Sequence, residues 1–161
     1  MRRPAFLIVL LTACAAGLRA QTREACVVTH IVDGDTFDCA GGARIRPIGI
    51  DTPERNQGEI YALARDALRT YADVGDTVQL EWDAARRDRY GRLLAWVWRD
   101  SVLVNEAMVG EGWAILHTVP PNVRHVARLE AAQHRARARR AGLWARDGFA
   151  CAPAAARRRA C

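Results

Sequence analysis

Three short strand-like segments follow one another between residues 26 and 50, each separated from the next by a tight turn. Residues 26–32 are rich in β-branched side chains, which favour strands. The Asp-Gly-Asp turn at 33–35 leads into a second strand at 36–39, and Gly41-Gly42 leads into a third at 43–50. Strands joined by such short turns pair as antiparallel neighbours, so the first part of the chain is predicted to form a β-meander.

The remainder of the chain alternates helical and extended patterns. From residue 58 the apolar side chains recur at three and four residues instead of two, which predicts an amphipathic helix. Strands are then expected at 77–82 and 92–98 around a charged loop, and helices at 58–74, 103–110 and 123–141. Five short strands with a helix between the third and the fourth predict an α+β fold, a five-stranded OB-type β-barrel with three helices packed on it.

Charge alone does not indicate a nucleic-acid partner. The formal net charge is +6 and all 24 basic residues are arginine, but residues 21–150 carry 18 arginines against 18 acidic residues. The excess of positive charge therefore lies only in the two ends of the chain. Any case for nucleic acid has to rest on where individual arginines are placed.

The N-terminus has the pattern of a secretory signal. Two arginines precede an apolar run at residues 5–16, which is too short for a membrane span. We expect residues 1–20 to be a signal peptide, which makes the protein secreted or periplasmic. Two alternatives stay open: a lipoprotein signal that leaves Cys14 lipid-anchored, and a retained anchor. Residues 21–150 are expected to form one domain, followed by a basic, cysteine-containing tail at 151–161 that we expect to be flexible.

Four cysteines remain beyond the signal region, and an even number in an exported protein favours disulfides. Three pairings are possible. Cys26 and Cys39 flank the turn at 33–36, so they could meet across the hairpin, which leaves Cys151 to pair with Cys161.

Three carboxylates and an arginine lie within about twenty residues of one another, at strand ends. Asp35, Asp51 and Glu54 offer hard oxygen atoms of the kind that Ca²⁺ prefers. Arg46 offers a planar guanidinium that can hold two phosphate oxygens. A cation site beside a phosphate clamp predicts phosphodiester hydrolysis. Alternation along the strand places Arg44 and Arg46 on the same face, so the pattern cannot choose between them.

Several motifs in order resemble those of one known family. They are Asp-Gly-Asp-Thr at 33–36, Ile-Gly-Ile-Asp-Thr-Pro-Glu at 48–54 and Asp-Arg-Tyr-Gly-Arg at 88–92, followed by Val-Asn-Glu-Ala-Met-Val at 104–109, Gly-Trp-Ala at 112–114 and Gly-Leu-Trp at 142–144. With this order and spacing, residues 25–145 resemble the staphylococcal nuclease (thermonuclease) family.

The resemblance implies an OB barrel with three helices and a calcium-dependent hydrolase that cleaves DNA and RNA and leaves 3′-phosphate ends. It implies that Asp35 and Asp51 bind Ca²⁺ through their carboxylates and Thr52 through its backbone carbonyl. The catalytic residues it implies are Glu54, which activates water, and Arg46 and Arg92, which clamp the phosphate. The residues implied to contact the substrate are Arg89 and Tyr90. The family position five residues before Asp51 selects Arg46 over Arg44.

The sequence departs from the family pattern in two places. Pro47 cannot donate a hydrogen bond within the third strand, so an edge or a bulge is expected there. The stretch 115–122 is short and offers His117, Thr118 and Val119 where the family has tyrosines.

We expect single-stranded DNA and RNA to be favoured as substrates, and we expect a monomer without a stable protein partner. The alternatives are a non-catalytic OB-fold module that binds nucleic acid and an envelope lipoprotein. The presence of all the implied acids and arginines favours the enzyme.

Overall fold

The computed structural model describes residues 23–161. Its strands are β1 Glu24–Asp33, β2 Thr36–Cys39, β3 Arg44–Pro47, β4 Gly49–Asp51, β5 Thr77–Arg87, β6 Leu93–Arg99, β7 Val102–Leu103 and β8 Ile115–His117. Its α-helices are α1 Glu59–Arg69, α2 Val104–Gly110, α3 Val126–Ala138 and α4 Pro153–Arg157, with short 3₁₀ helices η1 Arg55–Gln57 and η2 Gly142–Arg146. The expected signal peptide and Cys14 lie outside the described residues.

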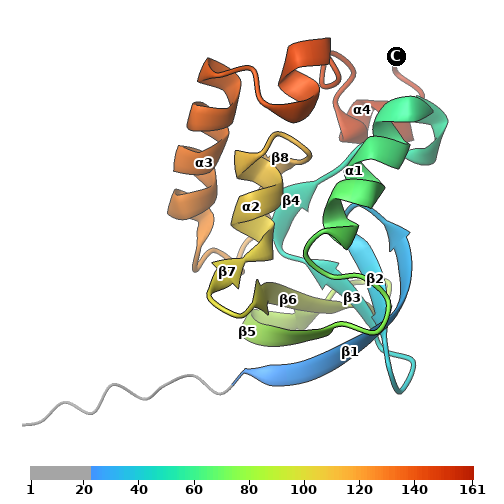
Figure 1. Ribbon diagram of the computed structural model, residues 1–161, viewed down its shortest axis with the longest axis vertical. Helices are drawn as coiled ribbons and strands as arrows, with labels where there is room; N and C mark the ends of the chain where they lie inside the picture. The colour runs from blue at the N-terminus through green and yellow to red at the C-terminus, as the bar shows by residue number, and fades with distance from the viewer. Residues whose placement is uncertain (1–22) are drawn as a thin grey trace, which may run out of the picture.

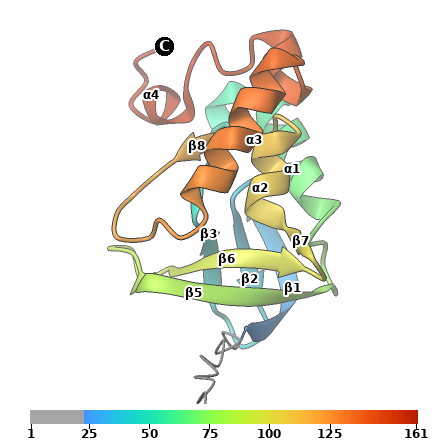
Figure 2. The same cartoon turned by 90° about the vertical axis from the view of Figure 1, so that its left-hand side faces the viewer.

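Five strands close into a barrel, as the sequence predicted. The sheet runs in the order β3-β2-β1-β5-β6, and β3 also pairs with β6, which closes the ring. The β3–β6 pairing is parallel and the other four are antiparallel. The two-residue strand β7, which was not predicted, extends the edge of β6. Figure 2 shows the barrel at one end of the molecule and the helices stacked on the other.

The barrel interior is filled by side chains from alternate positions of these strands. Phe37, Ile45 and Val97 are wholly buried there. Trp96 and Trp98 are buried on the opposite face of β6, where both rings contact His125. Alternation puts every second strand residue on the inner face, where apolar area is removed from water. Trp96 and Trp98 are therefore packing residues.

Three helices cover the open end of the barrel, in agreement with the prediction. Helix α1 packs through Ala64, Ala67 and Leu68, and α3 packs through Leu129, Ala132 and Ala136. Helix α2 lies between them in the ribbon views (Figure 1). Each helix is shorter than its apolar pattern suggested, because the pattern also includes capping and turn residues at either end.

The predicted third strand at 43–50 is wrong as a single strand, because it breaks at Ile48. Strand β3 ends at Pro47, and β4 leaves the barrel to pair with β8. Gly49 adopts a positive φ of 80°, and a Cβ atom there would lie 2.8 Å from Leu129, so the bend requires glycine. Asn105 of α2 stabilises the bend, since its amide donates to the Ile48 carbonyl at 2.7 Å.

The charged loop predicted at 83–91 is also shorter than expected. Strand β5 continues to Arg87, with an irregular register between Trp82 and Arg87. The remaining turn between β5 and β6 carries Asp88 and Tyr90, just before the start of β6.

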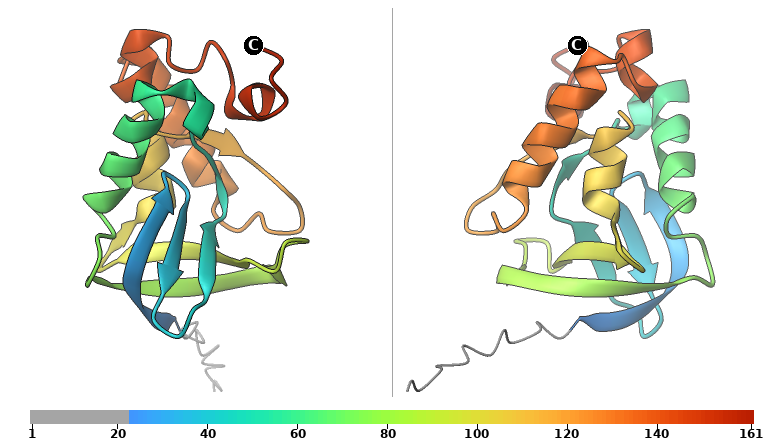
Figure 3. Two further views of the ribbon diagram at one scale, coloured as in Figure 1. Left: turned by 90° about the vertical axis from the view of Figure 1, so that its right-hand side faces the viewer. Right: turned by 60° about the vertical axis from the view of Figure 1, so that its left-hand side comes forward.

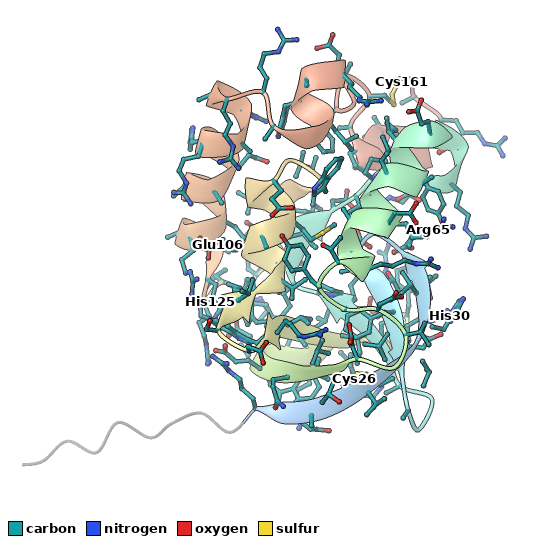
Figure 4. All side chains as sticks on the ribbon, viewed as in Figure 1. Cys26, His30, Arg65, Glu106, His125 and Cys161 are labelled. Atoms are coloured by element: carbon teal, nitrogen blue, oxygen red, sulfur yellow. A yellow bond between two sulfur atoms is a disulfide. The ribbon has the colours of Figure 1, made fainter. Side chains whose placement is uncertain are left out.

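Both predicted disulfides are present. Cys26 pairs with Cys39 across the β1–β2 hairpin, and Cys151 pairs with Cys161. Figure 4 labels Cys26 and Cys161, which lie at opposite ends of the molecule. Among residues 23–161, no helix has both the length and the apolar character needed to cross a membrane.

The prediction of a flexible tail was wrong. The tail forms α4, and the Cys151–Cys161 bond closes it into a loop. The side chains of Asn56 and Gln57 in η1 donate hydrogen bonds to the carbonyls of Ala156 and Cys151. Figures 1 and 3 show α4 at the helical end of the molecule, near the start of α1.

Candidate active site

Asp35 lies in the tight turn between β1 and β2, and its carboxylate is held by the chain around Thr52. Its Oδ2 atom accepts hydrogen bonds from the backbone amide and the hydroxyl of Thr52, at 2.9 and 3.1 Å. Gly34 permits this approach, because a Cβ atom there would lie 3.0 Å from the Thr52 side chain. The turn is therefore fastened to the end of β4, seventeen residues further along the chain.

Arg46 joins the two aspartates of the site. Its Nη2 atom lies 3.3 Å from Asp35 Oδ2 and 3.6 Å from Asp51 Oδ1. The same guanidinium donates to the carbonyls of Pro47 and Ile50, both at 2.7 Å, so its orientation is fixed by the bend after β3. All three charged side chains are buried.

Arg44 points elsewhere, although strand alternation placed it on the same face as Arg46. Its guanidinium pairs with Asp38 of β2, at 2.7 and 3.0 Å. The strand pattern could not choose between these two arginines, and the resemblance selected Arg46. The structure places Arg46 against Asp35 and Asp51, and Arg44 against Asp38.

Burial and the nearby charge of Asp35 make Asp51 and Asp33 harder to ionise than ordinary aspartates. Burial raises the pKa of Asp51, and the charge of Asp35 raises it further, while Arg157 and Arg46 oppose both effects. Burial together with Asp35 likewise raises the pKa of Asp33 to about 6. A cation placed between Asp35 and Asp51 would relieve this repulsion.

Glu54 stands at the rim of the same site, immediately before η1. Its side chain is 32% exposed, whereas that of Asp51 is 2% exposed. Its backbone amide donates to Gln57 Oε1 at 2.8 Å, which fixes the start of the 3₁₀ turn. Burial is the main reason that the pKa of Glu54 is raised. Glu54 and Asp35 line a hollow of about 340 Å³.

Arg157 of α4 enters this hollow and was missed from the sequence. Its Nη2 atom lies 2.8 and 2.6 Å from the two carboxylate oxygens of Asp51. Its Nε atom lies 3.0 Å from Glu54 Oε1. A run of three arginines between two cysteines was visible, but neither its distance from the motifs nor its composition indicated that it would fold back on them.

Two other predicted site residues line a second hollow. Arg92 and Tyr90 line it with Arg44, and its volume is about 960 Å³. Arg92 pairs with Asp88 through Nε at 2.7 Å, and the structure does not bring it into contact with the acids of the first hollow. The side chain of Arg89 is exposed and donates to the Tyr90 hydroxyl at 2.6 Å.

Comparisons with known proteins identify the family to which the chain belongs. Residues 44–146 match the family model described as staphylococcal nuclease homologue. The chain is 32% identical to the thermonuclease of Staphylococcus hyicus over 137 residues, which cover 81% of each chain. It is 33% identical to the thermonuclease of Staphylococcus intermedius, over 76% of this chain and 77% of that one. It is 28% identical to the endonuclease YncB of Bacillus subtilis, over 73% of this chain and 60% of the relative. With a closed five-stranded barrel, paired aspartates beside a buried arginine and a family match over most of its length, the chain belongs to the staphylococcal nuclease family.

Proposed function

We propose that this nuclease is exported and depends on Ca²⁺, and that it hydrolyses phosphodiester bonds of DNA and RNA to leave 3′-phosphate ends. The observation that carries the proposal is the convergence of Asp35 and Asp51, two buried carboxylates from the β1–β2 turn and from the end of β4, on the Arg46 guanidinium. Burying two like charges together is costly, and Arg46 and Arg157 offset only part of that cost, because the pKa of Asp51 is still raised. A site that binds a cation and a phosphate explains why the chain does so.

The residues present fit a hard cation. Asp35 and Asp51 offer carboxylate oxygens, and the backbone carbonyl of Thr52 lies next in the chain; these three are the proposed ligands. Oxygen-only donors suit Ca²⁺ better than they suit softer metals. No cluster of three or more His, Cys, Asp or Glu side chains suited to a metal is found among residues 23–161. Two carboxylates imply weak affinity, which is sufficient where calcium is plentiful.

Bound Ca²⁺ would supply charge neutralisation for the phosphate oxygens at which negative charge develops. The protein's own residues supply the remainder of the chemistry. Arg46, already fixed beside the aspartates, holds a phosphate oxygen. Glu54, at the exposed rim, accepts a proton from the attacking water. Arg92 turns from Asp88 to clamp the phosphate from the second hollow, because a guanidinium matches two phosphate oxygens at once.

The second hollow is proposed as the path of the nucleic acid beyond the scissile bond. Tyr90 lines it and is exposed, and the exposed Arg89 contacts the Tyr90 hydroxyl, so an arginine can hold a phosphate beside an aromatic ring that stacks on a base or a sugar. Stacking of this kind favours single strands, whose bases are accessible. We propose a monomer, with no stable protein partner.

Export is supported by the two disulfides, which persist in oxidising compartments. We propose that residues 1–20 are removed as a signal peptide, that 21–150 form the nuclease domain and that 151–161 form its closing segment. Attachment through a lipid on Cys14 is the alternative, and mass spectrometry of the mature N-terminus distinguishes the two.

The test uses purified residues 21–161 on single-stranded and double-stranded DNA and on RNA, with Ca²⁺ or with a calcium chelator. We expect cleavage only with Ca²⁺, faster on single strands, and products that become substrates for ligation only after their 3′-phosphates are removed. Equal cleavage in the presence of the chelator would show that the dependence on Ca²⁺ is wrong. Products with free 3′-hydroxyls would show that the assigned bond is wrong.

A further inference from the structure

The C-terminal segment places a cation of the protein itself in the acidic site. Both carboxylate oxygens of Asp51 are engaged by Arg157 Nη2, and Glu54 Oε1 is engaged by Arg157 Nε. These are the oxygens of a proposed calcium ligand and of the proposed base. Arg157 is therefore paired with two groups that the reaction needs free.

The segment that carries Arg157 is built to stay in place. The Cys151–Cys161 bond closes it into a loop, and Pro153 and Ala156 of α4 are buried. Two side chains of η1, which begins directly after Glu54, hold the carbonyls of Cys151 and Ala156 at 2.9 and 3.1 Å. Arg157 is thus carried by a segment that is fixed to η1 beside Glu54, whereas a free tail would sample many positions.

The contact has the features of a strong ion pair. Asp51 is 2% exposed, so its carboxylate has little water to replace a lost partner. Hydrogen bonds to a charged acceptor are among the stronger ones in proteins, and two of them converge on this carboxylate. A positive guanidinium and a divalent cation cannot both occupy the same face of one carboxylate.

We propose that the disulfide-closed segment at 151–161 is an autoinhibitory strap, in which Arg157 competes with Ca²⁺ for Asp51 and Glu54. The inference rests on the proposed calcium-dependent function. Binding of the metal and release of Arg157 are then the same event, so the strap lowers the apparent affinity of the site for Ca²⁺. Loosening the strap raises that affinity without any change in the ligands.

The experiment measures Ca²⁺ binding by isothermal titration calorimetry in the absence of substrate. The variants are Arg157→Ala, the control Arg158→Ala and the double variant Cys151→Ala/Cys161→Ala, which opens the loop but keeps Cys26–Cys39. Arg158 is a matched control because it carries the same charge in the same segment and is exposed, and it pairs with none of the site acids in the part of the chain that the structure describes.

We expect Arg157→Ala to tighten Ca²⁺ binding by about tenfold or more, because a charge-assisted pair no longer has to be broken. The double cysteine variant is expected to change the affinity in the same direction, and Arg158→Ala by less than about threefold. Thermal unfolding of each variant checks that the barrel is intact.

Two results would overturn the strap. One is an affinity in Arg157→Ala that is unchanged or weaker, which would make Arg157 a partner of the substrate instead. The other is an equal gain in Ca²⁺ affinity in Arg158→Ala, which would show that the effect comes from the total positive charge of the segment and not from the Arg157 contacts. Failure of the underlying function looks different: the wild-type protein and all variants would then bind no Ca²⁺, and a chelator would not affect cleavage.

Discussion

At the scale of single residues, Glu54 differs from the aspartates of the site in its access to water. Its side chain is 32% exposed, beside a carboxylate that is 2% exposed. An acid at a wet rim can accept a proton from water, whereas a buried one is better suited to hold a cation. Glu54→Gln is therefore expected to keep the fold and Ca²⁺ binding but to lower the cleavage rate by about 10²- to 10⁴-fold.

The rate is measured on single-stranded DNA at saturating Ca²⁺, with calorimetry to confirm binding. Glu59→Gln is the control, because Glu59, in the first turn of α1, is 75% exposed and its carboxylate pairs with Arg146 of η2. We expect that variant to cleave normally. A Glu54→Gln protein that cleaves as fast as the wild type would remove Glu54 from the mechanism.

Arg92 is the proposed catalytic residue that must move most. It pairs with Asp88 at 2.7 Å and lines the second hollow, away from the paired aspartates. If it turns to clamp the phosphate in the transition state, Arg92→Ala slows cleavage by about 10²-fold or more. Arg44→Ala is the matched control, since Arg44 lines the same hollow but pairs with Asp38. A loss of less than about tenfold in Arg92→Ala would reject the clamp.

The sequence motifs contain most of the charged residues that the structure brings together around Asp35 and Asp51, with one exception. The motifs that contain Asp35, Asp51 and Arg46 lie next to a turn or a strand end. At such positions the local backbone geometry decides which way a side chain points. Arg157 lies about a hundred residues away and reaches the site only through the fold of the tail. Such a contact leaves no periodic or spacing signal in the chain.

At the scale of secondary structure, the break between β3 and β4 decides where Asp51 lies. A continuous strand would keep Asp51 within the barrel wall. The bend turns β4 towards β8 and brings Asp51 to the Arg46 side chain. Pro47 was a sequence signal that the strand is irregular, but it did not reveal that the strand changes its partner, because β8 lies far along the chain and a pairing between distant segments leaves no local signal.

Asn105 stabilises the bend from α2. It is wholly buried, accepts a hydrogen bond from the Val97 amide at 2.8 Å and donates to the Ile48 carbonyl at 2.7 Å. Asn105→Ala leaves both groups buried and unpaired, so we expect a loss of about 2–4 kcal/mol in the free energy of unfolding. Denaturant titration followed by tryptophan fluorescence measures it. A loss below about 0.5 kcal/mol would mean that water replaces the amide.

At the scale of the whole molecule, a buried polar cluster joins the barrel to the helical layer. Glu81 of β5 is buried and accepts hydrogen bonds from Trp98 of β6 at 2.7 Å and from Arg124 at 3.0 Å. His125, labelled near the start of α3 in Figure 4, lies 3.1 Å from the same carboxylate. No pattern in the sequence indicated this cluster, because Glu81 is far along the chain from Arg124 and His125 and meets them only when the two layers pack.

The cluster makes a prediction about stability and pH. Burial raises the pKa of Glu81, but hydrogen bonds from Arg124, His125 and Trp98 outweigh it, so the pKa lies below its ordinary value of 4.5. A depressed carboxylate pKa stabilises the folded state fully above the pKa of the unfolded chain, and that contribution is lost as the pH falls through the folded pKa. Glu81→Gln is therefore expected to be less stable than the wild type by about 1–3 kcal/mol near neutral pH.

That difference should shrink as the pH falls below about 4.5, because the wild-type carboxyl then becomes neutral as well. The measurement is denaturant unfolding of both proteins from about pH 7 to about pH 3. Glu130→Gln, at an exposed position of α3, controls for the loss of a surface charge and should differ little from the wild type at any pH. A gap between wild type and Glu81→Gln that stays constant over this range would mean that the ionised carboxylate does not hold the two layers together.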